Sequence, residues 1–433
     1  MIMNWFEKNG IYRYEADEYV ILYSPVARKY VVACQEHIDD FLACSKHAEV
    51  FTPLAEYIPV SRQPKVKVPE DYTLLTVLPN NVCNFNCSYC YSAAGRNHAV
   101  LDAVRLYRAM DFFMESKPVD FRKPLTISFM GGGEPLLSWE LVRKGIEYAE
   151  AKAAERRLRL NVRIITNGSV LNDDVIAFLK AHRVEVSVSF ELLEDIQNLQ
   201  RKHYDLVRAN ICKLIAFGIP VQINSTITPA NVGMMLEMLD VLVRDFPEVR
   251  TAMFEPVTAQ DLFPTPSHLK VFYEEYVKNF VAVREKGDES GVDITSFAYL
   301  RTVFPLDRAC PGEFCITAEG FITGCYCVAT RNEPLSGQTF YGIASERGVE
   351  FDMERFERLL GHNVYSKEMC ASCEVKWNCG GGCFHQFHTY DVEYLDEVCG
   401  FTRNFIGSLV RYKVRKQLAG HAFQLPALLT EQF

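Results

Sequence analysis

Residues 73–95 read TLLTVLPNNVCNFNCSYCYSAAG, an apolar run followed by a loop that carries Cys83, Cys87 and Cys90. The run is continuous and aliphatic, which is typical of a strand buried on both faces. A structural zinc site uses four cysteine or histidine ligands, and His98 is the only histidine near these three cysteines. Three thiolates suit a cubane [4Fe–4S] cluster whose fourth iron stays open to another ligand.

Strands of the same kind alternate with amphipathic stretches up to about residue 257. The predicted strands cover 73–79, 125–131, 162–168, 184–190, 220–227 and 251–257. Repeated βα units imply right-handed crossovers and a parallel sheet with its chemistry at the carboxyl ends of the strands. Eight units close a barrel, so six predict an α/β fold with an open, partial (β/α)6 barrel. The cysteine loop follows the first strand, at the functional rim.

The flanking segments have other patterns. Three short strands and a helix are predicted within 10–48, as a small N-terminal α+β domain, and 60–71 has the composition of a linker. After about residue 300 the chain is rich in glycine, cysteine and aromatic residues, and 404–420 has the pattern of an amphipathic helix. The predicted domains are 1–68, 69–295, 296–404 and 405–433.

The net charge and the clustering of the cysteines limit which partners and which cellular compartment fit this sequence. The net charge of -9 argues against nucleic-acid and membrane partners, and no apolar run is long enough to span a bilayer. The 15 cysteines are clustered, and disulfides are rare in reducing compartments, so the clusters indicate metal binding. We expect a cytoplasmic protein without a signal peptide.

At the first cluster the sequence resembles the radical S-adenosylmethionine enzymes. Their CxxxCx(aromatic)C motif is matched by Cys83, Cys87, Tyr89 and Cys90. The resemblance implies that these cysteines bind a [4Fe–4S] cluster whose open iron chelates S-adenosylmethionine. Reductive cleavage of this cosubstrate would give a 5′-deoxyadenosyl radical, which abstracts a hydrogen atom from the substrate.

The resemblance also implies a cosubstrate pocket at the strand ends. Gly132, Gly133 and Glu134 match the family's GGE motif, which would hold the methionine ammonium. Arg201 would bind the methionine carboxylate. Ser189, with Ser187 as the second choice, would contact the ribose. Where the family often reads S-L-D-G, this chain reads S-F-E-L, so no role carries over to Glu191. The pocket residues carried over are Tyr89, Gly132, Gly133, Glu134, Thr166, Asn167, Ser187, Ser189, Arg201 and Glu255.

The C-terminal cysteines resemble the SPASM domain, an extension of these enzymes that holds two auxiliary [4Fe–4S] clusters. The resemblance implies that the first cluster is bound by Cys310, Cys325 and Cys383. It implies that the second is bound by Cys370, Cys373, Cys379 and Cys399. A pair of zinc knuckles is the alternative interpretation of these residues.

The first auxiliary cluster lacks one expected ligand. The fully ligated form of the domain has another cysteine shortly before Cys310, and this chain has none there. The site therefore either keeps an open iron or recruits Cys315 or Cys327. Alternation along the hairpin favours Cys327, which lies two residues beyond Cys325 and shares its face.

The resemblance extends to function and partners. It implies three [4Fe–4S] clusters, S-adenosylmethionine, a flavodoxin or ferredoxin-type electron donor, and a precursor peptide that is cross-linked or epimerised. The N-terminal domain would bind the leader of that peptide by adding it as a strand to a sheet edge; a packing cap on the barrel is the alternative.

Two other functions remain open from the sequence. Sulfatase-maturating relatives carry an aspartate as proton acceptor directly after the second cysteine of the hairpin. Here that position is Tyr326, the candidate catalytic residue, which makes sulfatase maturation the second choice. A non-catalytic zinc- or cluster-binding peptide adaptor is the third.

Overall fold

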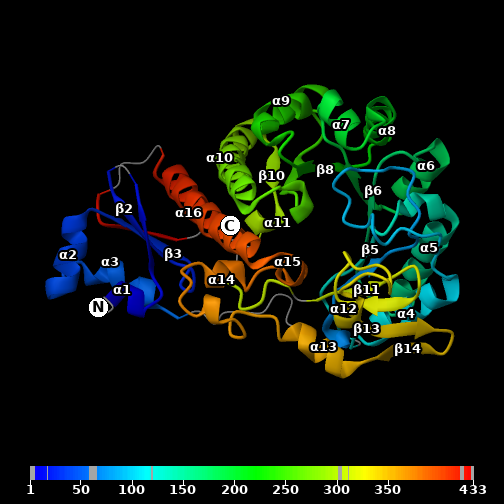
Figure 1. Cartoon of the computed structure of the whole chain (residues 1–433), viewed down its shortest axis with the longest axis horizontal. Coiled ribbons are helices and arrows are strands. Elements are labelled where there is room, and N and C mark those ends of the chain that lie inside the picture. The colour runs from blue at the N-terminus through cyan, green and yellow to red at the C-terminus, as the bar shows by residue number, and fades with distance from the viewer. Residues whose placement is uncertain are drawn as a thin grey trace.

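The centre of the fold is a curved parallel sheet with helices along its outer side (Figure 1). The computed structural model describes residues 5–16, 18–57, 66–118, 120–300, 305–310, 312–419 and 424–430. The parallel strands are β4 (Leu74–Val77), β5 (Leu125–Phe129), β6 (Leu160–Thr166), β7 (Glu185–Ser189), β8 (Val221–Ile227), β9 (Thr251–Pro256) and β10 (Asp293–Thr295). The outer helices are α4 (Ala103–Glu115), α5 (Trp139–Glu155), α6 (Asp173–Ala181), α8 (Tyr204–Ala216), α9 (Met235–Asp245) and α10 (Pro266–Ser290).

The six predicted strands all occur, and the parallel ladder runs without a break from β4 to β10. Strand β10, which has three residues and pairs with β9, was not predicted from the sequence. Among the described residues the sheet has free edges at β10 and β14 (Gly348–Phe351), so it does not close. The prediction of an α/β partial barrel is confirmed.

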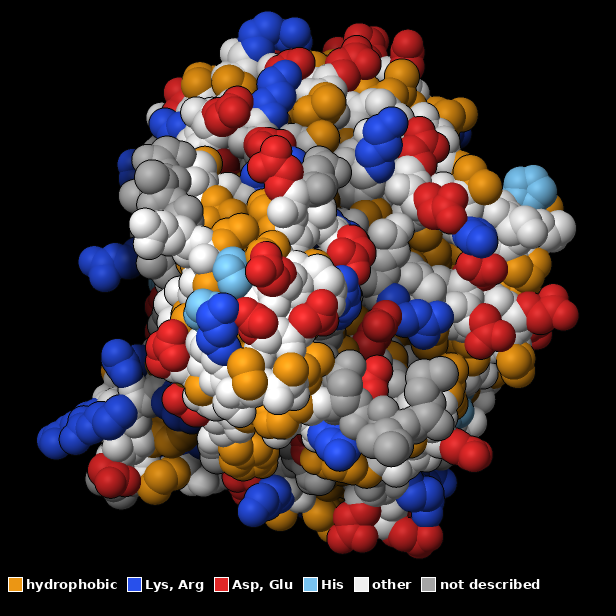
Figure 2. Space-filling view, turned by 90° about the vertical axis from the view of Figure 1, so that its left-hand side faces the viewer, with side chains coloured by type: hydrophobic (Ala, Val, Ile, Leu, Met, Phe, Trp, Pro, Cys, Tyr) orange, Lys and Arg blue, Asp and Glu red, His pale blue; other side chains and the backbone are white. Residues whose placement is uncertain are grey.

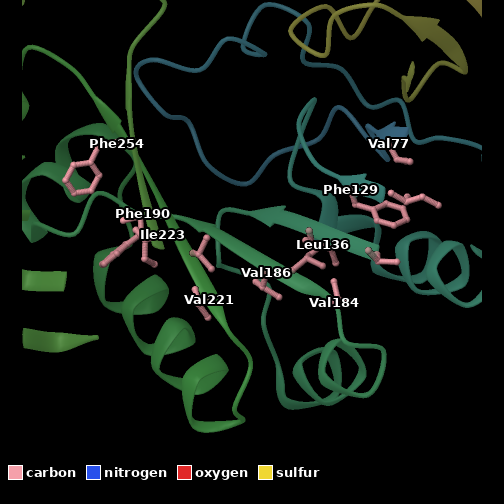
Figure 3. Close-up of a cluster of buried hydrophobic side chains, with 14 of the residues drawn as sticks. Val77, Phe129, Leu136, Val184, Val186, Phe190, Val221, Ile223 and Phe254 are labelled. Carbon is pink, nitrogen blue, oxygen red and sulfur yellow. The ribbon is translucent and has the colours of Figure 1, made fainter. Parts of the chain in front are cut away.

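The two faces of the sheet differ in chemistry. Outward-facing residues such as Val77, Phe129, Val186, Ile223 and Phe254 join the apolar core beneath the helices (Figure 3). Because side chains alternate along a strand, their sequence neighbours face the interior of the curved sheet. These inward positions are mainly polar and include Thr76, Thr126, Ser128, Asn161, Arg163, Ser187, Ser189, Gln222, Asn224, Thr226 and Glu255.

The N-terminal unit is a second sheet between two helical layers. Its strand order is β1 (Tyr12–Glu15), β2 (Val20–Ser24), β3 (Lys29–Ala33) and β15 (Ala427–Thr430). Its helices are α1 (Trp5–Lys8), α2 (Gln35–Cys44), α3 (Ala48–Phe51) and the 3-10 helix η1 (Thr52–Ala55). The predicted strands and helix are present, and the fourth strand comes from the far end of the chain. Of the predicted linker 60–71, residues 60–65 lie outside the described residues, and Pro69–Asp71 form a 3-10 helix.

The C-terminal region extends the main sheet. Strand β11 (Phe314–Ile316) pairs in parallel with β4, followed by the antiparallel strands β12 (Phe321–Thr323), β13 (Phe340–Ser345) and β14. The boundary predicted after 295 falls at the end of β10.

The helix predicted over 404–420 is longer than expected. Helix α16 (Val392–Leu418) begins earlier because Tyr394, Val398 and Phe401 continue its apolar contact with the core. The boundary predicted between 404 and 405 therefore lies inside this helix. It packs along α10, with an ion pair of 3.0 Å between Arg415 and Glu285. In the described part of the chain, no helix has the length and apolar character needed to cross a membrane.

Candidate active site at the strand ends

The three motif cysteines lie in the loop after β4 and are partly exposed. Burial raises the pKa of Cys83 and Cys87, and the Arg201 guanidinium opposes this rise at Cys87. N–H donors point at two of the sulfurs: the Phe85 amide lies 3.5 Å from Cys83 Sγ, and Arg96 Nη2 lies 3.5 Å from Cys90 Sγ. Donors of this kind stabilise thiolates, the form that binds iron.

The described cysteine, histidine, aspartate and glutamate side chains contain no group of three that converges on one point, as a single metal ion requires. The irons of a cubane occupy separate corners, so its thiolates need not converge.

The glycine-rich segment packs directly against the cysteine loop. The amide of Gly133 donates to the Asn80 carbonyl at 2.9 Å, and that of Glu134 donates to the Val82 carbonyl at 2.8 Å. A Cβ on Gly133 would lie 1.9 Å from the Val82 carbonyl oxygen, and Gly132 has a φ of +67°. Only glycine permits this approach, so these two glycines fix the position of the loop.

Glu134 joins the ends of β5 and β6. Its side chain is 2% exposed, and its carboxylate accepts hydrogen bonds from Thr166 Oγ1 at 2.7 Å, the Asn167 amide at 2.7 Å and the Leu136 amide at 3.1 Å. Burial raises the pKa of Glu134, while these hydrogen bonds lower it. Asn167 continues the network to Asn84 of the cysteine loop at 2.9 Å.

A buried group of three polar side chains lies behind the motif. Tyr89 Oη donates to Glu191 and accepts a hydrogen bond from Arg201 Nη1 at 2.8 Å. Glu191 Oε2 also accepts from the Thr226 amide at 3.0 Å. Burial raises the pKa of Glu191 to about 7 although Arg201 lowers it. Sequence reasoning assigned no role to Glu191, and the structure places it beside the motif tyrosine.

One N–H group of Arg201 is left unpaired by the described residues. Its side chain is buried, and within the described residues its Nε has no hydrogen-bond partner. A guanidinium with an unpaired N–H suits a carboxylate ligand, because a charge-assisted hydrogen bond can form between the two groups. The residues at the strand ends thus fit a ligand that has a carboxylate.

The remaining predicted pocket residues lie on the inner face of the sheet. Ser187 is buried and Ser189 is partly exposed, both on β7. The carboxylate of Glu255, on β9, accepts a hydrogen bond from the Phe297 amide at 2.7 Å. The structure brings together Tyr89, Glu134, Thr166, Asn167 and Arg201 around the cysteine loop. It places Ser187, Ser189 and Glu255 on strands farther along the same sheet.

The hairpin of β11 and β12 brings part of the second cysteine region to this loop. Cys325 and Cys327 follow β12, and the neighbouring Cys327, together with burial, raises the pKa of Cys325. The rings of Tyr326 and Tyr91 meet edge to face with centroids 5.7 Å apart, and Tyr91 follows the motif directly. Cys315 is fully buried and packs with Leu78 and Ala329.

The other C-terminal cysteines lie on short elements. Cys370 ends the 3-10 helix Glu368–Cys370, Cys379 ends α14 (Lys376–Cys379), and Cys399 lies in α16. A turn of three glycines at 380–382, all with positive φ, joins Cys379 to Cys383. The Ala309 amide donates to the Gly380 carbonyl at 2.7 Å, which brings the Cys310 segment against this turn.

A buried lysine at these cysteines was missed from the sequence. Lys367 is 9% exposed, and its Nζ bonds to the Gly381 carbonyl and to His362 Nε2, the latter at 2.8 Å. The ammonium lies 3.9 Å from the centroid of the Phe387 ring. Burial lowers the pKa of Lys367, and four nearby cysteines oppose this. They are Cys370, Cys379, Cys399 and Cys310. No spacing rule predicts such a contact, because lysine belongs to no cysteine motif.

Residues 77–242 match the Radical SAM superfamily. Among curated proteins, the radical SAM cyclopropyl synthase TigE of Paramaledivibacter caminithermalis is 19% identical over 80% of this chain and 75% of its own length. The serine-type anaerobic sulfatase-maturating enzyme of Klebsiella aerogenes is 26% identical over 34% of this chain and 35% of its own.

Two solved structures share the fold. Native anSMEcpe with bound AdoMet has a TM-score of 0.64 at 16% identity, covering 80% of this chain and 99% of that one. Streptococcus suis SuiB bound to precursor peptide SuiA has a TM-score of 0.53 at 15% identity, covering 74% of each chain. The sheet described above is therefore the radical SAM fold.

Proposed function

Because this chain is an enzyme with a radical S-adenosylmethionine domain, related to peptide-modifying and sulfatase-maturating enzymes, we propose that it modifies a ribosomally made precursor peptide. The product would be a cross-linked or epimerised peptide. The observation that carries this proposal is the position of the hairpin: its pairing with β4 puts the Cys325–Cys327 segment beside Tyr91, next to the motif cysteines.

We assign the site residues by the contacts described above. Cys83, Cys87 and Cys90 would hold a [4Fe–4S] cluster that, with S-adenosylmethionine, supplies a 5′-deoxyadenosyl radical when both are bound. Arg201 would bind the methionine carboxylate with its free N–H, while Tyr89 and Glu191 orient the guanidinium. Glu134 is already satisfied by the chain, so it acts by holding Thr166 and Asn167 in place.

The C-terminal cysteines would hold two further clusters, giving three in all, with an external flavodoxin or ferredoxin as reductant. Lys367 supports this assignment, because a buried ammonium is stabilised by anionic thiolate ligands around it. For the first auxiliary site, Cys327 is the better candidate for a fourth protein ligand, since it lies two residues from Cys325 and is partly exposed, while Cys315 is fully buried among apolar side chains.

Two neighbours favour a peptide as substrate. Streptococcus suis SuiB is solved with precursor peptide SuiA and anSMEcpe with the Kp18Cys peptide. The polar inner face of the open sheet offers an extended chain many hydrogen-bonding groups. Tyr326 stands where sulfatase-maturating relatives have an aspartate, which places sulfatase maturation second. The proposed domains remain 1–68 for peptide recognition, 69–295 for the barrel, 296–404 for the auxiliary clusters and 405–433 for the C-terminal part of α16 and the tail.

The test uses the anaerobically reconstituted enzyme with S-adenosylmethionine and a chemical reductant. It is offered either small peptides encoded beside its gene or a sulfatase-derived peptide with serine or cysteine. We expect 5′-deoxyadenosine in both reactions and a modified product only from a neighbouring peptide. A product aldehyde on the sulfatase peptide, trapped with a hydrazine, would instead establish the second function. Bound zinc in place of iron, with no 5′-deoxyadenosine formed, would instead support the non-catalytic peptide adaptor.

A further inference from the structure

Lys367 lies at the junction of the two proposed auxiliary sites. It immediately precedes the 3-10 helix that ends at Cys370, and its carbonyl accepts a hydrogen bond from the Cys370 amide at 3.0 Å. Its Nζ reaches across to the Gly381 carbonyl, in the glycine turn between Cys379 and Cys383. Cys379 belongs to the second proposed cluster and Cys383 to the first. The lysine therefore joins segments that carry ligands of both clusters.

Three contacts hold the ammonium group in place. Besides the Gly381 carbonyl, Nζ bonds to His362 Nε2 at 2.8 Å and lies 3.9 Å from the centroid of the Phe387 ring. Burial lowers the pKa of His362 to about 3, so this imidazole is neutral at pH 7 and accepts the hydrogen bond through Nε2. A carbonyl oxygen, a neutral imidazole and an aromatic face all favour the charged form of lysine. The fold thus fixes both the position and the charge of this side chain.

The charge of Lys367 is surrounded by cysteines rather than carboxylates. The side chain is 9% exposed, and within the described residues it forms no ion pair with an aspartate or a glutamate. Burial lowers the pKa of Lys367, and four cysteines oppose this effect. They are Cys370, Cys379, Cys399 and Cys310. The first three belong to the second proposed cluster, so the ammonium acts mainly on that site.

Charges on the surface are poorly placed to act in the same way. On the face that carries the N-terminal unit, acidic and basic side chains are interspersed rather than gathered into a patch of one sign (Figure 2). Lys376 also lies near Cys370, but its side chain is partly exposed and its Nζ donates to the Ala371 carbonyl at 2.9 Å. Salt screens exposed charges over about 10 Å, whereas buried charges are screened much less. Lys367 is therefore the cation that acts strongly on these cysteines.

We propose that Lys367 raises the reduction potential of the second auxiliary cluster above that of the first. A cubane gains one negative charge when it accepts one electron, and a positive charge held nearby stabilises that reduced form. The second cluster has most of its ligands around the ammonium, so it is the better electron acceptor of the two. An electron that enters the C-terminal region then remains on it. This inference rests on the proposed function, because it requires both auxiliary clusters.

The test is a titration with titanium(III) citrate, followed by electron paramagnetic resonance. It uses the full chain with Cys83, Cys87 and Cys90 changed to alanine, the two-cluster protein, so that only the auxiliary clusters contribute. Lys367→Met removes the charge and keeps a long side chain, and Lys376→Met is the matched control. We expect Lys367→Met to disfavour reduction of the second cluster at least tenfold, a fall in midpoint potential of about 59 mV for one electron. Lys376→Met should change it less than about twofold.

Two further variants complete the titration. Adding Cys399→Ala removes a ligand of the second cluster alone and so identifies its signal. Lys367→Arg keeps the charge and should restore a midpoint close to that of the two-cluster protein, which a role of the lysine in packing alone does not predict. An unchanged midpoint in a Lys367→Met protein with full iron content would overturn the proposal. A fall of equal size in Lys376→Met would overturn it too, because a screened charge would then act as strongly as a buried one.

The order of the two midpoints covers the case in which Lys367→Met does not fold or loses its iron. In the two-cluster protein the second cluster should be reduced at the higher potential, and the reverse order would overturn the proposal. Iron analysis separates this failure from that of the proposed function, since two cubanes contain about eight iron atoms per chain. Zinc in their place would overturn the inference together with the proposed cluster content. Formation of 5′-deoxyadenosine by the protein with its motif cysteines intact tests the radical chemistry independently.

Discussion

The two cysteine regions are supported in different ways. The loop with Cys83, Cys87 and Cys90 is attached to the ends of long buried strands by a continuous hydrogen-bond network through Asn167 and Glu134. In the C-terminal region, Cys370 and Cys379 end helices of three and four residues, and Cys373 lies in the turn between them. The first arrangement is held by the protein itself, whereas the second has little secondary structure to define it. We therefore expect the second region to depend on the proposed auxiliary clusters for its structure.

The largest effect is expected from removing the first set of ligands. With Cys83, Cys87 and Cys90 changed to alanine, 5′-deoxyadenosine formation should be abolished, and iron should fall by about one third of the three clusters proposed. The thermal unfolding midpoint should change little, because the network around Glu134 needs no metal. Residual cosubstrate cleavage would contradict the assignment of this loop.

Stripping iron with a chelator from the wild-type protein tests the comparison directly. Amides of 365–399 should lose protection from hydrogen exchange by orders of magnitude, while those of β5 to β8 retain theirs, because metal binding and folding are coupled where little else holds the chain. If both regions retain their protection, the second one is as well held by the protein as the first.

The variants Cys327→Ala and Cys315→Ala test which cysteine of the hairpin completes the first auxiliary site. Loss of iron from the first auxiliary site is expected for Cys327→Ala. Cys315→Ala should keep its iron and lose about 1 kcal/mol of unfolding free energy through a small apolar cavity. Full iron content in both variants would show that the fourth position is open to an external ligand.

Acid should weaken the second region through His362. Burial lowers the pKa of His362 from 6.5 to about 3, with Lys367 adding to the effect. Between these values the unfolded chain binds a proton that the folded chain does not, so stability falls as the pH drops. The loss should reach at most about 2 kcal/mol at pH 5. His362→Gln keeps an acceptor for Lys367 and should remove this dependence in denaturant titrations; an unchanged pH slope would contradict the explanation.

The smallest effect is expected at Glu134. Glu134→Gln keeps the side-chain shape and replaces one acceptor oxygen with a donor, which leaves Thr166 or Asn167 without its partner. We expect S-adenosylmethionine to bind several-fold more weakly, equivalent to about 1 kcal/mol, with normal iron content. Isothermal titration of the reconstituted protein measures this, and an unchanged dissociation constant would mean that the network has no influence on the pocket.

The parts of the molecule that repeat a local pattern were predictable. Six strands and the partial barrel follow from apolar runs at regular spacing, and the cysteine motif follows from its own letters. Contacts between segments that are distant in the sequence were not predictable. Strand β15 pairs with β3 although nearly the whole chain separates them. Lys367 lies near Cys310 because both of their segments pack against the glycine turn 380–382. Glu191 was visible as a departure from the family pattern, but its partners Tyr89 and Arg201 appear only after folding.

The pairing of β11 with β4 has a consequence for producing pieces of this protein. Strand β4 is the first strand of the barrel, and β11 satisfies its outer backbone groups. A barrel expressed alone, ending near residue 295, would expose a flat apolar edge that includes Leu75 and Val77, and edges of this kind recruit other chains. We expect such a fragment to form insoluble aggregates during expression, and fusing residues 305–351 back to it should restore a clear lysate.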